Sequence, residues 1–222
     1  MGDVWKSVFR GSYKGTEIVL KVAPSSHILR ELAVFDILSK YEGYLSSNIA
    51  KLLSVVSVSD SNWRFGLIGE YYPQGSLYDL LKDGRTMLQV DELCHLVESV
   101  VLGLVFLHEL RPNKPAIAHR NFKSSKILVG RSEKGQLRAF LSDMSSALVF
   151  NGCEDSRSRS KVGDCRYMAP ELLEGLVDVD YSAYLAIDMY AFSLVLWEVL
   201  STAGLVFVYL SRTCVFSTIR EL

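Results

Sequence analysis

Residues 116–129, AIAHRNFKSSKILV, place a basic turn without any acidic residue between two apolar flanks. The flank KILV at 126–129 and the later segment RAFLSD at 138–143 have the content of a short strand pair. Between the flanks lies Asn121, whose amide is too weakly basic to accept a proton at neutral pH. The stretch therefore predicts a strand preceded by a basic turn, and the chemistry of that turn depends on Asn121.

The composition is that of a folded protein with no strong net charge. With 222 residues, 49% hydrophobic and 22% charged, the chain can bury one sizeable core or two adjoining lobes. The formal charge is −1 and the pI is about 6.4. We therefore expect no nucleic-acid partner, since no global field would attract one.

Neither the cysteines nor the N-terminus indicates a secreted protein. Four cysteines are scattered without CxxC or Cys/His metal spacing, and MGDVWKSVFRG lacks the apolar core of a signal peptide. The apolar run 194–210 is interrupted by Glu198, Ser201 and Thr202, and it barely reaches spanning length. We expect a buried core helix there, with a membrane span as the alternative.

The first seventy residues predict strand, strand, helix, strand, strand. Residues 3–23 alternate as a hairpin around the turn GSYKG at 11–15, and residues 27–41 have helical spacing. Residues 49–60 and 63–72 predict two further strands. This part forms the expected small sheet lobe, assigned to residues 1–72.

Helical patterns dominate after residue 72. Residues 76–83 and 91–110 have apolar positions every three or four residues, and 186–200 is apolar nearly all round, as in a buried central helix. The change predicts an α+β protein in which a larger helical lobe, residues 73–200, meets the sheet lobe at a cleft.

Seven motifs follow one another on matching elements. They are Gly2-x-Val4, Val19-Leu20-Lys21, Glu31, His119-Arg120-Asn121, Asp143-Met144-Ser145, Ala169-Pro170-Glu171 and Asp188. In this order they resemble the protein kinase signature. More narrowly, KPAIAHRNFKSSKILV, RYMAPELLEG and IDMYAFSLVLWE resemble the type II receptor serine/threonine kinases of the transforming growth factor-beta and activin group. The resemblance implies a bilobal kinase-like fold.

The resemblance implies an ATP site on the sheet lobe. Gly2 would be the last glycine of the phosphate-covering loop, where backbone N–H groups approach phosphate oxygens. Lys21 would contact the phosphates and be held by Glu31, with Asp36 as a rival partner on the same helix. The alternative for Lys21 is an exposed lysine at a strand end.

The same resemblance implies an adenine pocket at the junction of the lobes. Backbone groups of Glu70 and Tyr72 would bind the adenine edge, and Val4, Val19 and Leu128 would enclose the base. An ordinary core role is the alternative for these apolar residues.

Two departures from the kinase pattern bear directly on phosphoryl transfer. At Asn121 the family has an aspartate that accepts the substrate proton, and at Lys126 it has an asparagine that holds magnesium. An amide is not a base, and an ammonium repels a metal ion. The expected activity is therefore impaired, and Mg²⁺ binding is doubtful.

The remaining site residues are two acids and a lysine. Asp143 would be the surviving magnesium ligand, and Lys123 is typical of the serine/threonine class. Asp164 replaces the usual threonine; it would pair with Lys123 or Lys126 or act as a displaced base, while the alternative is a solvated loop residue.

The resemblance also sets expectations for the whole protein. We expect a kinase domain truncated at both ends, without the first strand and the last helices, and with a non-family apolar tail at residues 201–222. An intact relative would act at the cytoplasmic side of the plasma membrane on a type I-like receptor kinase. The rival interpretations are a non-catalytic, pseudokinase-like scaffold for a partner receptor and a chain with no stable fold.

Overall fold

The structure is a computed structural model of the 222-residue chain. The residues that it describes are 7–23, 25–41, 43–44, 47–59, 64–83, 88–112, 114–150, 162–175 and 181–202. The predictions for Gly2, Val4 and most of the tail lie outside these residues.

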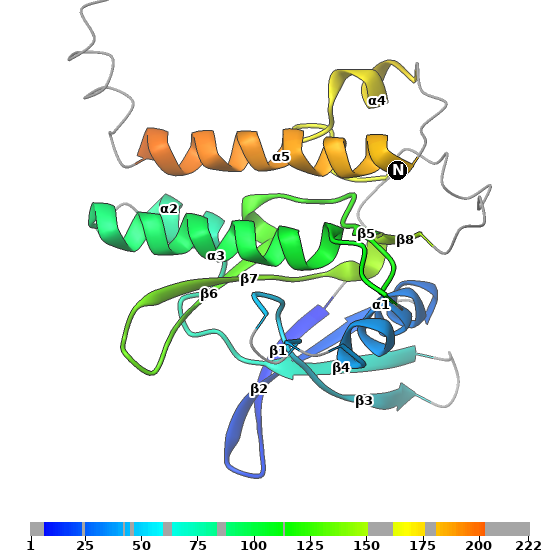
Figure 1. Ribbon diagram of the computed structural model, residues 1–222. Coiled ribbons are helices and arrows are strands. Elements are labelled where there is room, and N and C mark those ends of the chain that lie inside the picture. Colours follow the sequence, from blue (N-terminus) through cyan, green and yellow to red (C-terminus); the bar gives the residue numbers. More distant parts are fainter. Residues whose placement is uncertain are drawn as a thin grey trace, which may run out of the picture.

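Within the described part of the sheet lobe, there are four antiparallel strands and one helix, in the predicted order. The strands are β1 (Ser7–Tyr13), β2 (Thr16–Ala23), β3 (Leu52–Ser59) and β4 (Arg64–Glu70), arranged β1-β2-β4-β3. Helix α1 (Ser25–Ser39) lies between this sheet and the rest of the molecule (Figure 1). Ile28 of α1 packs with Ala23 of β2 and Leu67 of β4. This contact holds α1 against the sheet and fixes where its polar side chains lie.

The turn of the β1–β2 hairpin is tighter than the sequence predicted. Strand β1 continues through Tyr13, and only Lys14 and Gly15 form the turn, with φ angles of 50° and 80°. Two consecutive left-handed residues are typical of a two-residue hairpin turn, whose twist matches that of the flanking strands. The predicted turn at 11–15 is therefore wrong for Gly11, Ser12 and Tyr13, which pair with β2.

The second lobe is mainly helical and is arranged in layers around two small strand pairs. Its helices are α2 (Leu77–Asp83), α3 (Val90–His108), α4 (Pro170–Glu174) and α5 (Tyr181–Thr202). Its strands are β5 (Ile117–Ala118), β6 (Ile127–Arg131), β7 (Leu137–Leu141) and β8 (Leu148–Val149). Two 3₁₀ turns, η1 (Ser124–Lys126) and η2 (Met144–Ser146), follow β5 and β7. Figure 1 shows α5 and α3 running side by side above the β6–β7 pair.

Helix α5 is buried on one side only. Ala191, Val195 and Val199 lie in the main core, but Trp197 is 59% exposed and Met189 is 47% exposed. Among the described residues, α5 makes its principal contacts with α2, α3 and β5, which lie on one side of it. Within the part of the chain that the structure describes, the Trp197 side is therefore not covered, whereas the opposite side is buried as predicted.

By length and mean hydropathy (1.5), residues Ser182–Thr202 of α5 could also cross a membrane. Two acidic side chains of this segment are used inside the fold. Asp188 accepts hydrogen bonds from the backbone after β5, and Glu198 accepts one from Tyr167. These contacts are typical of a core helix and favour that interpretation.

Candidate active site

Lys21 joins the sheet lobe to α1 and to the second lobe. Its ammonium donates to Glu31 Oε2 at 2.5 Å and to Asp143 Oδ1 at 2.7 Å. Burial alone would lower the pKa of Lys21, but the carboxylates of Glu31 and Asp143 outweigh it, so the pKa is raised. The ammonium therefore stays charged at neutral pH and is held at the junction of the lobes.

The partner of Lys21 is Glu31 and not Asp36. Glu31 is 4% exposed, and the alternation of β2 and the packing of α1 bring the two side chains together. Asp36 instead pairs with Lys40 one turn later, at 2.6 Å on the helix surface. Lys21 is likewise not the exposed strand-end lysine of the alternative, since its side chain is 17% exposed.

Asp143 receives a second ammonium, from Lys126, on its other carboxylate oxygen. The chain brings the two residues together because the Ser142 N–H and hydroxyl both donate to the Lys126 carbonyl, each at 2.9 Å. This contact joins the end of η1 to the end of β7. Glu31, Lys21, Asp143 and Lys126 therefore form a continuous chain of alternating charge, which we call the charge chain.

Residues on either side of Asp143 hold it in place. Asp143 has a left-handed backbone (φ 63°), which costs about 1–3 kcal/mol and is kept only where the surroundings impose it. Met144 is fully buried in the main core, and η2 packs against α1. The Ser145 hydroxyl donates to Asp143 Oδ1 at 2.7 Å. The aspartate is thus fixed relative to the helix that carries Glu31.

These residues do not fit a magnesium ion as the family would hold it. Both oxygens of Asp143 accept hydrogen bonds from ammonium groups, and Lys126 stands at the second ligand position. Mg²⁺ requires oxygen ligands in near-octahedral geometry, and a lysine ammonium is a cation that cannot donate electrons to it. Among the described residues, no group of three or more His, Cys, Asp or Glu side chains could hold a metal ion.

The turn that contains Asn121 is anchored by Asp188, a residue of α5. Asp188, 1% exposed, accepts the N–H groups of His119 at 2.6 Å and Arg120 at 2.9 Å, and it contacts His108 Nε2 at 3.0 Å. Arg120 has a left-handed backbone (φ 63°). The two hydrogen bonds from the His119 and Arg120 N–H groups hold this strained turn. Asp188 therefore helps to position Asn121, the residue that follows Arg120.

His119 has a structural role in this turn. It is 1% exposed, its Nε2 contacts the Ser142 carbonyl at 3.0 Å, and its Nδ1 accepts the Asn121 N–H at 3.3 Å. These partners suit the neutral ring with the proton on Nε2. This is the geometry of a packed, structural histidine.

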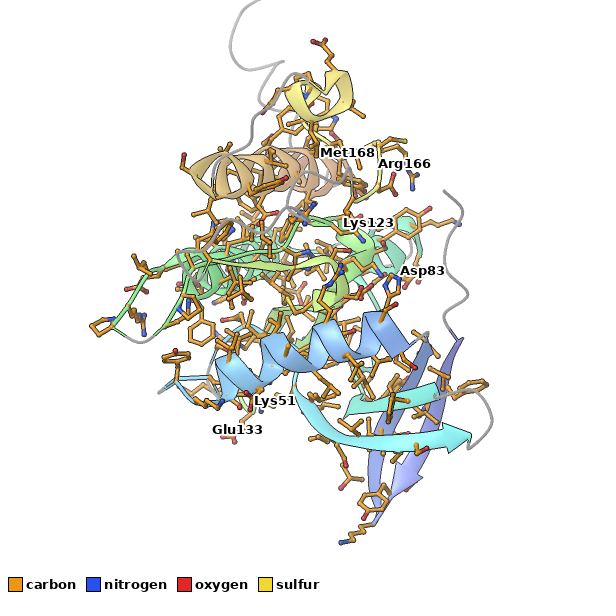
Figure 2. All side chains as sticks on the ribbon, turned by 90° about the vertical axis from the view of Figure 1, so that its right-hand side faces the viewer. Lys51, Asp83, Lys123, Glu133, Arg166 and Met168 are labelled. Carbon is orange, nitrogen blue, oxygen red and sulfur yellow. The ribbon has the colours of Figure 1, made fainter. Side chains whose placement is uncertain are left out.

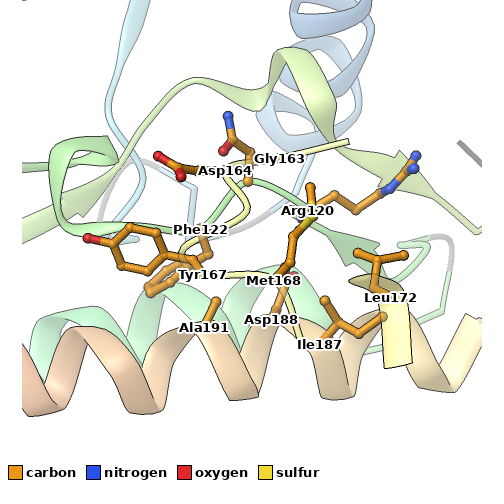
Figure 3. A pocket seen from close by; sticks show the side chains of 11 residues that line it. Arg120, Phe122, Gly163, Asp164, Tyr167, Met168, Leu172, Ile187, Asp188 and Ala191 are labelled. Atoms are coloured by element: carbon orange, nitrogen blue, oxygen red, sulfur yellow. The ribbon is translucent and has the colours of Figure 1, made fainter. Parts of the chain in front are cut away.

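Asn121 is one of the residues that line a small pocket between this turn and α5. Its Oδ1 is buried without a hydrogen-bond partner. The pocket is also lined by Asp164, Tyr167 and Met168, and Figure 3 shows the last two side chains above α5. A buried acceptor without a donor is costly, and at such a site it is a candidate to bind a ligand N–H or O–H.

A close backbone contact brings the segment containing Asp164 to this turn. A Cβ on Gly163 would lie 2.7 Å from the Arg120 carbonyl oxygen, and Gly163 has φ +127°. Only glycine fits at this distance and conformation. The next residue, Asp164, is therefore held beside the turn.

Asp164 pairs with Lys123 and Arg166. Of the two lysines named as possible partners in the sequence analysis, it is therefore Lys123 that binds Asp164. Lys123 Nζ lies 3.0 Å from Asp164 Oδ2, and Arg166 donates to both carboxylate oxygens. Figure 2 shows Lys123 and Arg166 close together on one side of the helical lobe. The Arg166 hydrogen bonds, followed by that of Lys123, hold the pKa of Asp164 far below its usual value. A carboxylate so stabilised is a weak base, so the geometry favours a positioning role.

The residues predicted to surround an adenine ring lie at the junction of the lobes. Val19 and Leu128 are half-buried, and Val19 lies two residues before Lys21, on the same face of β2. The Glu70 N–H donates to the Lys51 carbonyl, and the Tyr72 carbonyl accepts the Gly75 N–H. These two backbone groups are therefore bonded within the chain, and the adenine contacts of Glu70 and Tyr72 stay a prediction.

The comparisons with known proteins agree with this geometry. The family model described as "Protein kinase domain" matches residues 12–212. The chain belongs to the protein kinase family. Activin receptor type-2A of Rattus norvegicus and of Homo sapiens are each 35% identical over 210 residues, which cover 90% of this chain and 38% of the receptor. Activin receptor type-2B of Xenopus laevis is 42% identical over 142 residues, 61% of this chain and 27% of the receptor.

The match confirms the predicted family and fold class. The kinase domain is related to those of the activin receptors, and it spans 38% of the length of the type-2A receptors. Its sheet lobe and helical lobe are those of a bilobal α+β kinase.

Within the kinase, the structure brings the predicted site residues into two groups. Lys21, Glu31, Asp143 and Lys126 form the charge chain, which is the first group. Asn121, Lys123 and Asp164 form the second group, which lies in the segment that precedes β6 and the segment that precedes α4. Their roles in nucleotide and substrate binding stay predictions.

Sequence reasoning missed two residues of these groups. Ser145 was named only as part of the Asp143-Met144-Ser145 motif, although its hydroxyl binds Asp143. Arg166 was not considered, although it holds Asp164 together with Lys123. A hydroxyl or guanidinium two residues after an aspartate is the pattern that indicates such local contacts, because short side chains bond to neighbours two positions away.

Proposed function

We propose that this chain is a receptor-type serine/threonine kinase domain that retains its nucleotide site and transfers phosphate slowly or not at all. The observation that carries the proposal is the pairing of Lys126 with Asp143 next to a turn whose proton acceptor is replaced by Asn121. The intact Lys21–Glu31 pair supports retained nucleotide binding, and the two replaced residues support impaired transfer.

Lys21 is suited to bind the phosphates of ATP. Its ammonium stays charged, is held by Glu31, and lies at the junction of the lobes, so it can attract an anion without first being ordered. Glu70, Tyr72, Val19 and Leu128 would hold the base. When bound, ATP supplies the phosphoryl group that kinases transfer to a hydroxyl.

Phosphoryl transfer lacks its proton acceptor in this chain. General-base catalysis contributes roughly 10²–10⁴-fold, which corresponds to about 3–5 kcal/mol of barrier. The carbonyl of an amide such as Asn121 can accept a hydrogen bond from a substrate hydroxyl, but it cannot take the proton. The residues present therefore orient a serine or threonine hydroxyl without activating it.

The biological setting that we propose follows the activin receptors. The substrate would be a serine or threonine of a partner receptor of the type I kind, at the cytoplasmic side of the plasma membrane. The relatives extend well beyond the region matched here, since that region covers 38% of the type-2A receptor.

The second candidate is a non-catalytic scaffold that binds a partner receptor through the surface of the fold. Asn121 and Lys126 together favour it, since both replace residues on which transfer depends. The candidates differ in turnover: a slow kinase transfers phosphate in a manner that depends on Lys21, whereas a scaffold transfers none.

Nucleotide binding is tested by thermal unfolding with ATP, with and without Mg²⁺. At an ATP concentration about 100 times Kd, binding stabilises the native state by about 2.7 kcal/mol, and the melting temperature rises accordingly. We expect Lys21→Met to lose most of this rise, because it removes the ammonium that faces the phosphates. Lys134→Met, on the exposed β6–β7 turn, is the matched control.

If the unaltered chain melts cooperatively but ATP leaves its melting temperature unchanged under both conditions, the nucleotide site is absent. Because Lys21→Met also removes a partner of the buried Glu31, Lys21→Arg serves as a second variant that keeps the charge.

A further inference from the structure

The Asp143 carboxylate already has a cation bound to it, which is the Lys126 ammonium. Lys126 donates to one Asp143 oxygen while Lys21 donates to the other. With Glu31, the charge chain contains two ammonium groups and two carboxylates, so it is electrically neutral before any ligand binds. In the family pattern, magnesium supplies the positive charge that this aspartate presents to phosphate oxygens.

We propose that the Lys126 ammonium replaces the divalent cation, so that this domain binds nucleoside triphosphates without metal. The inference rests on the proposed retention of the nucleotide site. It states which group supplies the positive charge that faces the phosphates in that site. The ligand class is a free polyphosphate nucleotide, and the residues that bind its phosphates are Lys21 and Lys126.

The position of Lys126 suits this role. Its side chain is 22% exposed, so it reaches solvent while it pairs with Asp143, which is 6% exposed. Its backbone carbonyl is held by two hydrogen bonds from Ser142, which fixes the root of the side chain. An ammonium has three N–H donors, so it can bridge a carboxylate and a phosphate oxygen as a metal ion does. It needs no dehydration of the kind that Mg²⁺ requires.

The same contacts oppose a magnesium ion. Mg²⁺ at Asp143 would have to displace Lys126 from the carboxylate and would then lie beside the Lys21 and Lys126 ammonium groups. ATP that carries Mg²⁺ is also less negative than free ATP, so it gains less from the two lysines. Affinity for ATP is therefore expected to be at least as high in EDTA as in excess MgCl₂.

Isothermal titration of the full chain with ATP, in EDTA and in excess MgCl₂, tests the inference. The unaltered chain is expected to bind at least as tightly in EDTA. Lys126→Asn is expected to lose about 10–100-fold in EDTA, the worth of one charge-assisted hydrogen bond, and to regain affinity when Mg²⁺ is added. Lys126→Arg keeps the charge and should stay independent of metal. Lys134→Asn is the matched control and should behave as the unaltered chain.

The outcomes separate the inference from the proposed function. If the unaltered chain binds ATP only with Mg²⁺, or if Lys126→Asn binds as tightly in EDTA as the unaltered chain, the inference is wrong and the nucleotide site stands. If the unaltered chain melts cooperatively but binds ATP neither in EDTA nor in MgCl₂, then both the inference and the proposed nucleotide site are wrong. Loss of binding by Lys126→Asn under both conditions, with Lys126→Arg unaffected in EDTA, supports the ammonium as the binding group.

Discussion

The double variant Asn121→Asp/Lys126→Asn is expected to transfer phosphate to a peptide serine about 10²–10⁴-fold faster than the unaltered chain. The first change supplies a carboxylate where Asn121 Oδ1 now lies without a partner, so a substrate hydroxyl can lose its proton. The second removes the ammonium that occupies Asp143. The remaining residues of the site, Lys21 and Lys123, are already in place.

The two single variants serve as controls for the double variant. Residues that act together in one site give non-additive effects, so we expect each single variant to recover less than its share of the gain. A new proton acceptor should also give the double variant a rate that falls at low pH, where the carboxylate is protonated. A folded double variant that is no faster than the unaltered chain would show that other residues limit transfer.

Asp188→Ala is expected to destabilise the fold by about 3–5 kcal/mol, a large share of the stability of a domain. The change leaves the buried N–H groups of His119 and Arg120 without their acceptor, and it removes the partner of His108. Each unsatisfied buried donor costs about 1–3 kcal/mol. Urea denaturation followed by circular dichroism measures the loss.

Asp36→Ala is the matched control for Asp188→Ala. Asp36 pairs with Lys40 on the surface of α1, and an exposed helix pair contributes about 0.3–0.5 kcal/mol. Equal destabilisation by the two variants would mean that the bonds from Asp188 do not anchor the turn. A larger effect of Asp188→Ala would assign the anchoring role to α5.

Local patterns were sufficient to predict the strands and helix of the sheet lobe, the β6–β7 pair and the longer helices of the second lobe, but they did not predict β5, β8 or α4. Alternation predicted β1 and β2, and helical spacing predicted α1 and α3, because each pattern reflects which side of an element meets the core. The hairpin turn was placed too widely because GSYKG contains turn-forming residues throughout, and pairing with β2 decided which of them turn. The exposure of Trp197 depends on which elements pack against α5. The spacing of apolar residues along the helix does not carry that information.

In the candidate site too, the sequence was sufficient for the residue types but not for the pairings that depend on the fold. The residue types at Asn121 and Lys126 could be interpreted from the family pattern, and the Lys21–Glu31 pair was expected from it. The pairing of Lys126 with Asp143 and of Asp164 with Lys123 was not decided by sequence. Both pairs join residues that are far apart in the chain, and competing partners of the right charge were available to each.

The central claim is that this kinase domain has lost its proton acceptor and carries the Lys126 ammonium on Asp143, at the position where the family pattern has a metal-binding aspartate. The most direct test is the rate at which the purified, unaltered chain transfers labelled phosphate from ATP to peptide serine and threonine. We predict a rate at least about 10²-fold below the 1–100 s⁻¹ that is typical of kinases. A rate within that typical range, abolished by Lys21→Met, would contradict the account.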